Sequence, residues 1–256
     1  MANSTSILVI NPNSTLSMTE ALVHLLQDLL RSNLHLDFYT APPSAPKSIN
    51  DEETSEASKK ETLPDLLNFL ESANVVEHGE PRSYAAYLVA CYSAHPLTPI
   101  LRELLRVPVL NIFEASVIRG RSLGLPFGIV TTGQYWESAL SAGMADIKLN
   151  ASGEYAEDTA TRENFVGVRS TGLSAAELHS TPREEVDRRI VEASAELVRK
   201  GAQVVLLGCA GMSGMEEAVG RGARSEGSEV RIIDGVRAGV ELLEVWVRSG
   251  TGRVSL

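Results

Sequence analysis

The feature that most constrains the fold is a series of short apolar runs that alternate with helical patterns along the 256 residues. The runs are uninterrupted, which is typical of strands that are covered on both faces. Repeated strand–helix units predict mostly parallel sheets with helices on both faces, so we assign the chain to the α/β class. The clearest runs are Ile7–Ile10, Ala86–Cys91, Val107–Ile112, Phe127–Thr132, Val204–Cys209 and Arg231–Asp234, and weaker ones are Asp37–Thr40 and Phe165–Arg169.

These eight predicted strands divide into two sets of four, each with one strand that ends in cysteine. Two helices have sequence signals for their first turns. Ser17–Glu20 fits a capping box, and Thr181–Glu184 combines a cap, a proline and a glutamate. We expect surface loops at the polar segments 42–61, 150–164 and 224–229, the first of them mobile.

Composition excludes several classes of function. Hydrophobic residues make up 43% of the chain and charged residues 22%, so a normal core is expected. The net charge of -10, with no basic cluster, argues against nucleic acid and anionic lipid as partners. No apolar run approaches the roughly 20 residues that span a bilayer, and the polar start does not resemble a secretory signal. We expect a cytoplasmic protein without a membrane or nucleic-acid partner, and we expect it to form a homo-oligomer.

The two cysteines occupy similar places in the pattern. Cys91 and Cys209 are each the last residue of a predicted buried strand, just before a turn and a helix. Ligands of open α/β sheets bind beyond these strand ends, where backbone N–H groups and helix dipoles lower the pKa of a thiol. A lone cysteine on an apolar strand is usually a packing residue. The pattern alone leaves both interpretations open, although two equivalent positions favour a site.

Other common motifs are missing. The first strand runs into Asn11–Thr15 rather than a glycine-rich G-x-G-x-x-G turn, so nucleotide binding has little support. Cys91 and His95 lack the C-x-x-C or H-x-x-x-H spacing of a zinc site, and we interpret His95 as a loop histidine. Two cysteines are too few for a disulfide scaffold.

The segment Ile7–Thr15 resembles the start of the hydantoin racemase branch of the aspartate/glutamate racemase superfamily. Further segments follow in the order of that family, so the likeness covers nearly the whole chain. Cys91–Leu97 is similar to the corresponding segment of fungal hydantoin or allantoin racemase-like proteins. The further segments are Ala90–Ser93, Gly128–Gly133, Leu207–Met212 and Asp234–Val236.

The resemblance implies two similar Rossmann-like three-layer domains with parallel sheets, related by a pseudo-two-fold axis. The first would comprise residues 1–98 and 213–256 with Cys91, and the second residues 99–212 with Cys209. The two thiols would face each other across an interdomain cleft that holds the active site. The implied activity is cofactor-independent, metal-free racemisation of a small molecule, a 5-substituted hydantoin or allantoin, in which one cysteine removes a proton and the other returns one.

The same resemblance implies substrate-binding residues. Removal of the proton leaves an enolate, which the backbone N–H groups after each cysteine and nearby hydroxyl groups would stabilise. For three of the expected binding residues, a structural role is an equal alternative to substrate binding. Asn11 would shape a turn, and Thr131 and Thr132 would cap the helix that begins near Gln134. The expected substrate-binding residues are Asn11, Tyr92, Ser93, Thr131, Thr132, Ala210 and Gly211.

One departure affects the substrate. Bacterial hydantoin racemases have a Gly-Asp-Pro-Gly-like turn after the first cysteine, whereas this chain has Tyr92–Pro96. We expect Tyr92, Ser93 and His95 at the mouth of the cleft, with Tyr92 narrowing the pocket; the alternative places Tyr92 in the core. The superfamily also includes maleate isomerases and arylmalonate decarboxylases, so another isomerase, decarboxylase or lyase, or a non-catalytic ligand-binding or redox-sensing relative, remains an alternative.

Overall fold

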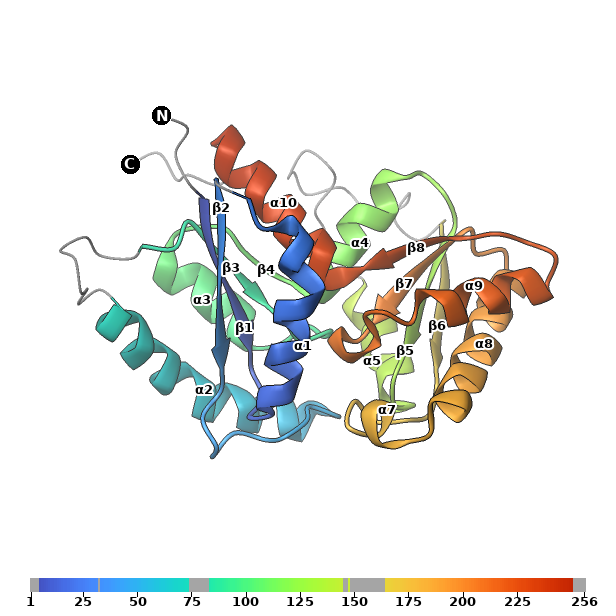
Figure 1. Cartoon of the computed structure of the whole chain (residues 1–256), viewed down its shortest axis with the longest axis horizontal. Helices are drawn as coiled ribbons and strands as arrows, with labels where there is room; N and C mark the ends of the chain where they lie inside the picture. The colour runs from blue at the N-terminus through green and yellow to red at the C-terminus, as the bar shows by residue number, and fades with distance from the viewer. Residues whose placement is uncertain (1–4, 32, 74–82, 145–146, 148–163, 251–256) are drawn as a thin grey trace. The chain divides into compact units, whose positions relative to one another are not determined.

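The computed structural model describes residues 5–31, 33–73, 83–144, 147 and 164–250 (Figure 1). The chain divides into two compact units. Unit 1 combines Met1–Cys91, His95–Asn111 and Gly239–Leu256, and unit 2 combines Tyr92–Ala94 and Ile112–Ala238.

The unit boundaries differ from the expected ones at residues 99–111, which belong to unit 1, and at 92–94 and 213–238, which belong to unit 2. Strand pairing explains the differences at 99–111 and 213–238. The strand at Val109–Asn111 pairs with Tyr87–Val89 of unit 1, and the strand at Arg231–Asp234 pairs with Val204–Leu207 of unit 2.

Unit 1 contains a parallel four-stranded sheet in the order β2-β1-β3-β4. Its central strand β1 pairs with both β2 and β3, with Ile10 opposite Tyr39 on one side and Val89 on the other. The predicted runs are confirmed as strands. Their bounds are β1 Thr5–Asn11, β2 Leu34–Thr40, β3 Ala86–Val89 and β4 Val109–Asn111.

Helices cover both faces of this sheet (Figure 1). Leu8 and Ile10 of β1 pack in one buried cluster with Leu66 of α2 and Leu101 of α3. On the opposite face, α10 comes so close that a Cβ added to its Gly239 would lie 2.5 Å from Leu88. The unit 1 helices are α1 Leu16–Leu26, the 3-10 turn η1 Gln27–Leu29, α2 Glu52–Ala73, α3 Leu97–Leu105 and most of α10 Gly235–Ser249.

The expected loop at 42–61 is wrong over its second half, where α2 begins at Glu52. The helix is capped locally, since Asp51 Oδ1 accepts hydrogen bonds from the Thr54 amide at 2.8 Å and from its hydroxyl at 2.7 Å. Its buried face begins with hydroxyl residues at helical spacing, so the segment is amphipathic without being apolar. The buried residues are Ser55, Ser58, Thr62 and Leu66.

Unit 2 contains a second parallel sheet in the order β6-β5-β7-β8, which is the strand order of the first sheet with each number raised by four. The expectation of two similar parallel α/β sheets is thereby confirmed. Its strands are β5 Phe127–Thr131, β6 Phe165–Ser170, β7 Val204–Gly208 and β8 Arg231–Asp234. Its helices are α4 Ile112–Ser122, α5 Tyr135–Gly143, α7 Glu177–Ser180, α8 Arg183–Arg199, the 3-10 turn η2 Ala210–Met212 and α9 Glu216–Ser225.

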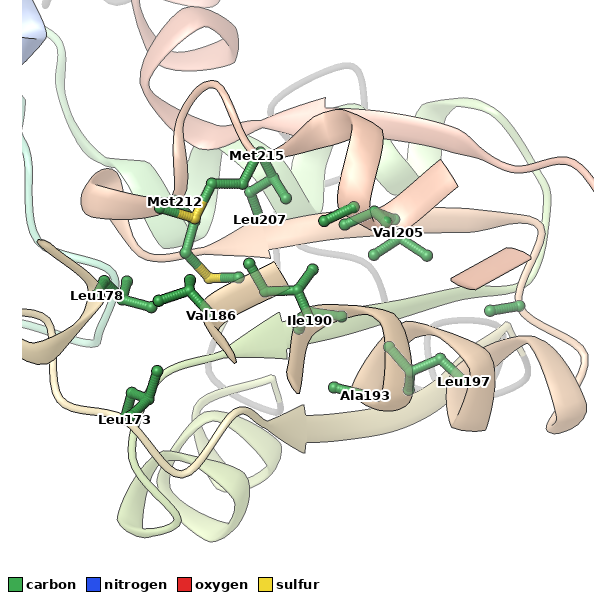
Figure 2. Packing of buried hydrophobic residues seen from close by; sticks show 14 residues of the cluster. Leu173, Leu178, Val186, Ile190, Ala193, Leu197, Val205, Leu207, Met212 and Met215 are labelled. Atoms are coloured by element: carbon green, nitrogen blue, oxygen red, sulfur yellow. The ribbon is translucent and has the colours of Figure 1, made fainter. Parts of the chain in front are cut away.

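The core of unit 2 lies between β5, β7 and helices α8 and α9 (Figure 2). Ile190 and Leu197 of α8 are fully buried, as their helical spacing predicts, and they share a cluster with Val205 and Leu207 of β7. Met212 of η2 joins the same cluster. The turn after β7 is therefore anchored in the core.

Both predicted cap structures are wrong in detail. Helix α1 begins at Leu16, with Thr15 at its N-cap position and no hydrogen bond from a capping side chain. Helix α8 was expected to have Thr181 as its cap and Pro182 in its first turn, but it begins at Arg183 with Pro182 in the N-cap position, again with no side-chain cap. Segment 224–229 contains the end of α9, and nearly all of segment 150–164 lies outside the described residues. Within the described part of the chain, no helix is long and apolar enough to cross a membrane.

Candidate active site

The two cysteines follow equivalent strands of the two sheets. Cys91 comes after β3 with one residue between, and Cys209 comes directly after β7. In each sheet this strand is third in the spatial order: β3 in β2-β1-β3-β4 and β7 in β6-β5-β7-β8. Both residues are half-buried, and neither forms a disulfide. One thiol therefore lies at the carboxyl edge of each sheet, where α/β proteins bind ligands.

The Cys209 side chain accepts a hydrogen bond from the turn that follows it. The backbone of Cys209 is extended, with φ -162°, and its Sγ accepts a hydrogen bond from the Gly211 amide at 3.4 Å at the start of η2. The residue packs against the unit 2 core, and this burial raises the pKa of the Cys209 thiol to about 11, although the amide hydrogen bond partly opposes the rise. This pKa keeps Cys209 protonated at neutral pH.

Cys91 packs at the edge of the unit 1 core, next to the cluster that contains Val89. The preceding residue continues the strand pairing, because the Ala90 amide donates to the Ile10 carbonyl at 2.8 Å. This bond places Cys91 just beyond the point where β1 also ends, at Asn11.

The Asn11 side chain shapes the turn between β1 and α1. Its amide donates to the Thr19 hydroxyl at 3.0 Å, and its Oδ1 accepts from the Asn13 amide at 3.2 Å. Asn13 in turn accepts from the Thr15 amide at 2.9 Å. The structural role expected for Asn11 is confirmed, whereas its contact with substrate stays a prediction.

His95 is fully buried in unit 1, so its expected place at the mouth of a site is wrong. Its Nδ1 accepts from the Leu97 amide at 3.2 Å, which places the ring proton on Nε2, facing the Ser58 hydroxyl at 3.2 Å. Ser58 donates onward to the Pro12 carbonyl at 2.5 Å. Burial and the nearby Lys59 charge lower the pKa of His95 to about 4, so a neutral imidazole links the segment after Cys91 to the turn after β1.

Tyr92 is also buried, with 6% of its surface exposed, and it belongs to unit 2. Its hydroxyl lies 2.7 Å from the Ser116 hydroxyl, and its ring packs against Phe113 with centroids 5.3 Å apart. Burial raises the pKa of Tyr92. The expected place of Tyr92 at the mouth of the cleft is therefore wrong, and the alternative, a side chain packed in the core, is the one observed. Ser93 is buried too, and contact of either residue with substrate stays a prediction.

Thr131, the last residue of β5, and Thr132, which follows it, are both buried. The expected helix-capping role is wrong for both threonines. The Thr131 hydroxyl donates to the Gly208 carbonyl at 2.8 Å, which ties β5 to the residue before Cys209. The carbonyl of Thr132 accepts from the Gly172 amide at 3.0 Å. Helix α5 begins at Tyr135 with no side-chain cap.

A buried carboxylate also supports the turn after Cys209. Asp234, at the end of β8, accepts a hydrogen bond from the Ser213 hydroxyl and caps α10 through the Val236 amide at 2.8 Å and the Arg237 amide at 2.9 Å. Burial raises its pKa. The roles of Ser213 and Ser58 could not be predicted from the sequence, because single serines form no recognisable motif. The described residues contain no cluster of three His, Cys, Asp or Glu side chains suited to a metal ion.

Comparison with known proteins identifies the family of this chain. The family described as Asp/Glu/hydantoin racemase matches residues 7–243. The Schizosaccharomyces pombe protein C1F7.10 is 38% identical over 94% of this chain and 92% of its own length. The hydantoin racemase of Pseudomonas sp. strain NS671 is 25% identical over 94% of this chain and 86% of its own.

The fold comparison covers almost the whole chain. The crystal structure of allantoin racemase from Pseudomonas fluorescens superimposes with a TM-score of 0.74 at 22% identity, covering 98% of this chain and 97% of that one. A match at this identity shows a shared fold. The family match over residues 7–243 decides the classification. The chain belongs to the Asp/Glu/hydantoin racemase family.

Proposed function

We propose that this chain is a cofactor-independent racemase that inverts the carbon next to a carbonyl in a hydantoin-type cyclic ureide, either a 5-substituted hydantoin or allantoin. Cys91 and Cys209 are the two groups that exchange protons with that carbon. The observation that carries the proposal is the equivalent position of the two thiols, each after the third strand in its sheet order.

Two thiols suit this reaction because inversion needs a base on one face of the carbon and an acid on the other. The thiolate of one cysteine removes the α-proton, the thiol of the other returns a proton to the opposite face, and the roles exchange for the other enantiomer. Burial keeps Cys209 protonated, which suits it to be the acid for one enantiomer. The proposal requires that both sulfurs reach one carbon, on the order of 10 Å apart or less, since each transfer needs hydrogen-bond reach.

The intermediate is an enolate whose charge needs hydrogen-bond donors. The Thr131 hydroxyl is committed to the Gly208 carbonyl, so it is a poor candidate. The backbone amides of the turn after Cys209 are better placed, because the Gly211 amide already points at the sulfur. In a hydantoin the ring carbonyl also delocalises the negative charge, so the reaction needs no cofactor as electron sink.

The substrate class rests on the relatives. Hydantoin racemases match along more than nine-tenths of this chain, and two allantoin racemases have the same fold. Both named substrates contain a five-membered ureide ring with the stereocentre next to a carbonyl. We place the protein in the cytoplasm, where a reducing environment keeps both cysteines as thiols.

Polarimetry with a substrate panel tests the proposal. Single enantiomers of methyl- and benzyl-hydantoin, allantoin, alanine, aspartate and glutamate are incubated with the protein, and maleate and an arylmalonate are followed by chromatography. We expect loss of optical rotation for a hydantoin or for allantoin. The matched control is the double variant C91S/C209S, which should leave the rotation unchanged. Conversion of maleate or the arylmalonate, with no racemisation of any ureide, would contradict the proposal.

A further inference from the structure

Gly211 has no side chain at a place where two reactive groups come close. A Cβ added to Gly211 would lie 3.0 Å from His179 Nε2 and 3.6 Å from Cys209 Sγ. The backbone of Gly211 does not adopt the left-handed conformation that favours glycine. A methyl group here would require the imidazole of His179 to shift by a few tenths of an ångström, and the imidazole nitrogen and the sulfur both border this space.

Helix α7 holds His179 in this position. The helix is short, and its first residue is tied to the preceding segment, since the Ser174 hydroxyl donates to Glu177 Oε2 at 2.8 Å and accepts from the Glu177 amide at 3.3 Å. The next residue, Leu178, is 4% exposed and lies in the unit 2 core together with Met212 of η2 (Figure 2). The anchored Leu178 places the backbone of its neighbour His179 beside the turn that contains Gly211.

The proposed role of Cys209 requires a nearby group that can accept its proton. As a thiol it returns a proton to the substrate, but for the other enantiomer it must first lose its own proton. The Gly211 amide stabilises a thiolate but accepts no proton. An imidazole can accept one through its unprotonated ring nitrogen and is charged or neutral within the physiological range of pH.

We infer that His179 is a positioning residue that accepts the Cys209 proton and holds the resulting thiolate. In this step the Cys209 S–H bond breaks, the proton binds His179 Nε2 directly or through one water molecule, and the product is a thiolate beside an imidazolium. The proton returns by the reverse path. The catalytic role of the thiolate rests on the proposed function, whereas the pairing of His179 with Cys209 does not.

Alkylation by iodoacetamide tests the pairing without any substrate, because the thiolate is the reactive form. Each cysteine is followed separately by peptide mass spectrometry near neutral pH. In His179→Gln we expect the alkylation rate of Cys209 to fall on the order of tenfold, whereas Cys91 in the same molecule keeps its rate. The matched control is His24→Gln, which removes an exposed histidine of α1 and should change neither rate.

A double-variant cycle separates the pairing from damage to the turn. Gly211→Ala places a methyl group against the imidazole and should slow Cys209 alkylation as much as His179→Ala does. In the His179→Ala background that methyl group meets no ring, so Gly211→Ala should add no further loss. Added imidazole should restore part of the rate in His179→Ala, because the site of the lost ring is exposed to solvent.

Racemase activity provides a second readout. In His179→Gln we expect kcat/KM to fall on the order of 100-fold. The fall must be equal in both directions, since the two enantiomers have the same free energy. An unchanged alkylation rate of Cys209 in His179→Gln would overturn the inference even if the wild type racemises ureides. A slowed rate in a protein that racemises none of them would leave the pairing intact and refute the proposed function instead.

Discussion

Protonation of His95 should destabilise this protein over a defined range of pH. The imidazole is fully buried, its Nδ1 accepts from the Leu97 amide, and its pKa is lowered from 6.5 to about 4. In the unfolded chain His95 takes up a proton below about pH 6.5, whereas the folded protein takes it up only near pH 4. The stability that depends on the neutral ring is therefore present above pH 6.5 and is lost as the pH falls toward 4.

The size of the loss follows from the same two pKa values. Each unit of difference corresponds to about 1.36 kcal/mol, so the drop from 6.5 to about 4 amounts to at most about 3 kcal/mol of unfolding free energy. That is a large part of the roughly 5–15 kcal/mol by which most domains are stable.

Urea unfolding of wild type and His95→Gln, from about pH 7 down to about pH 4.5, measures this contribution. Glutamine does not titrate, so the variant should be less stable near neutral pH but should lose less stability on acidification. Carboxylates titrate in the same range in both proteins and cancel in the difference. The control His24→Gln should follow the wild type. Parallel pH profiles for wild type and His95→Gln would refute the assignment of a buried neutral imidazole.

Three further substitutions test the packing around the site. Leu197→Ala removes a fully buried side chain of α8 and should cost about 2–5 kcal/mol of unfolding free energy in urea titrations, with activity unchanged where the variant is folded. Gly208→Ala would place a Cβ 2.6 Å from the Val130 carbonyl oxygen and should lower the free energy of unfolding by about 3 kcal/mol. Activity should fall as well, because the adjacent Cys209 moves. A variant as stable as the wild type would contradict the observed spacing of β5 and β7. Tyr92→Phe removes the buried hydrogen bond to Ser116 and should cost about 0.5–1.5 kcal/mol by thermal melting, while the ratio of methyl- to benzyl-hydantoin turnover stays the same; a changed ratio would return Tyr92 to the substrate pocket.

The sheets could be predicted from the sequence because the buried strands are continuous apolar runs. Arg231–Asp234 was predicted to the residue, and the other strands to within a few residues at their ends. Helix α2 was partly missed because its buried face includes Ser58 and Thr62, whose hydroxyls both donate to the Pro12 carbonyl. Periodicity of apolar residues cannot detect a helix that is buried through hydrogen bonds.

The candidate site could be predicted only in part. The strand pattern identified the positions of Cys91 and Cys209, since parallel strands end at the same edge of a sheet. His179 precedes Cys209 by a full helix and a strand, and nothing in the sequence pattern indicates that α7 folds back against η2. Gly211 does not adopt a positive φ, so its close approach to His179 can be seen only in the structure.

Deuterium exchange by the single-cysteine variants tests the central claim most directly. Each enantiomer of the best ureide substrate is incubated in D2O with Cys91→Ser or Cys209→Ser, and exchange at the stereocentre is followed by NMR and corrected with an enzyme-free blank. A serine hydroxyl is a far poorer base than a thiol near neutral pH, so neither variant should racemise either enantiomer. We predict that each variant exchanges the α-proton of one enantiomer only, and that the enantiomer differs between the two variants. Racemisation at the wild-type rate by Cys91→Ser or by Cys209→Ser would contradict the two-thiol account.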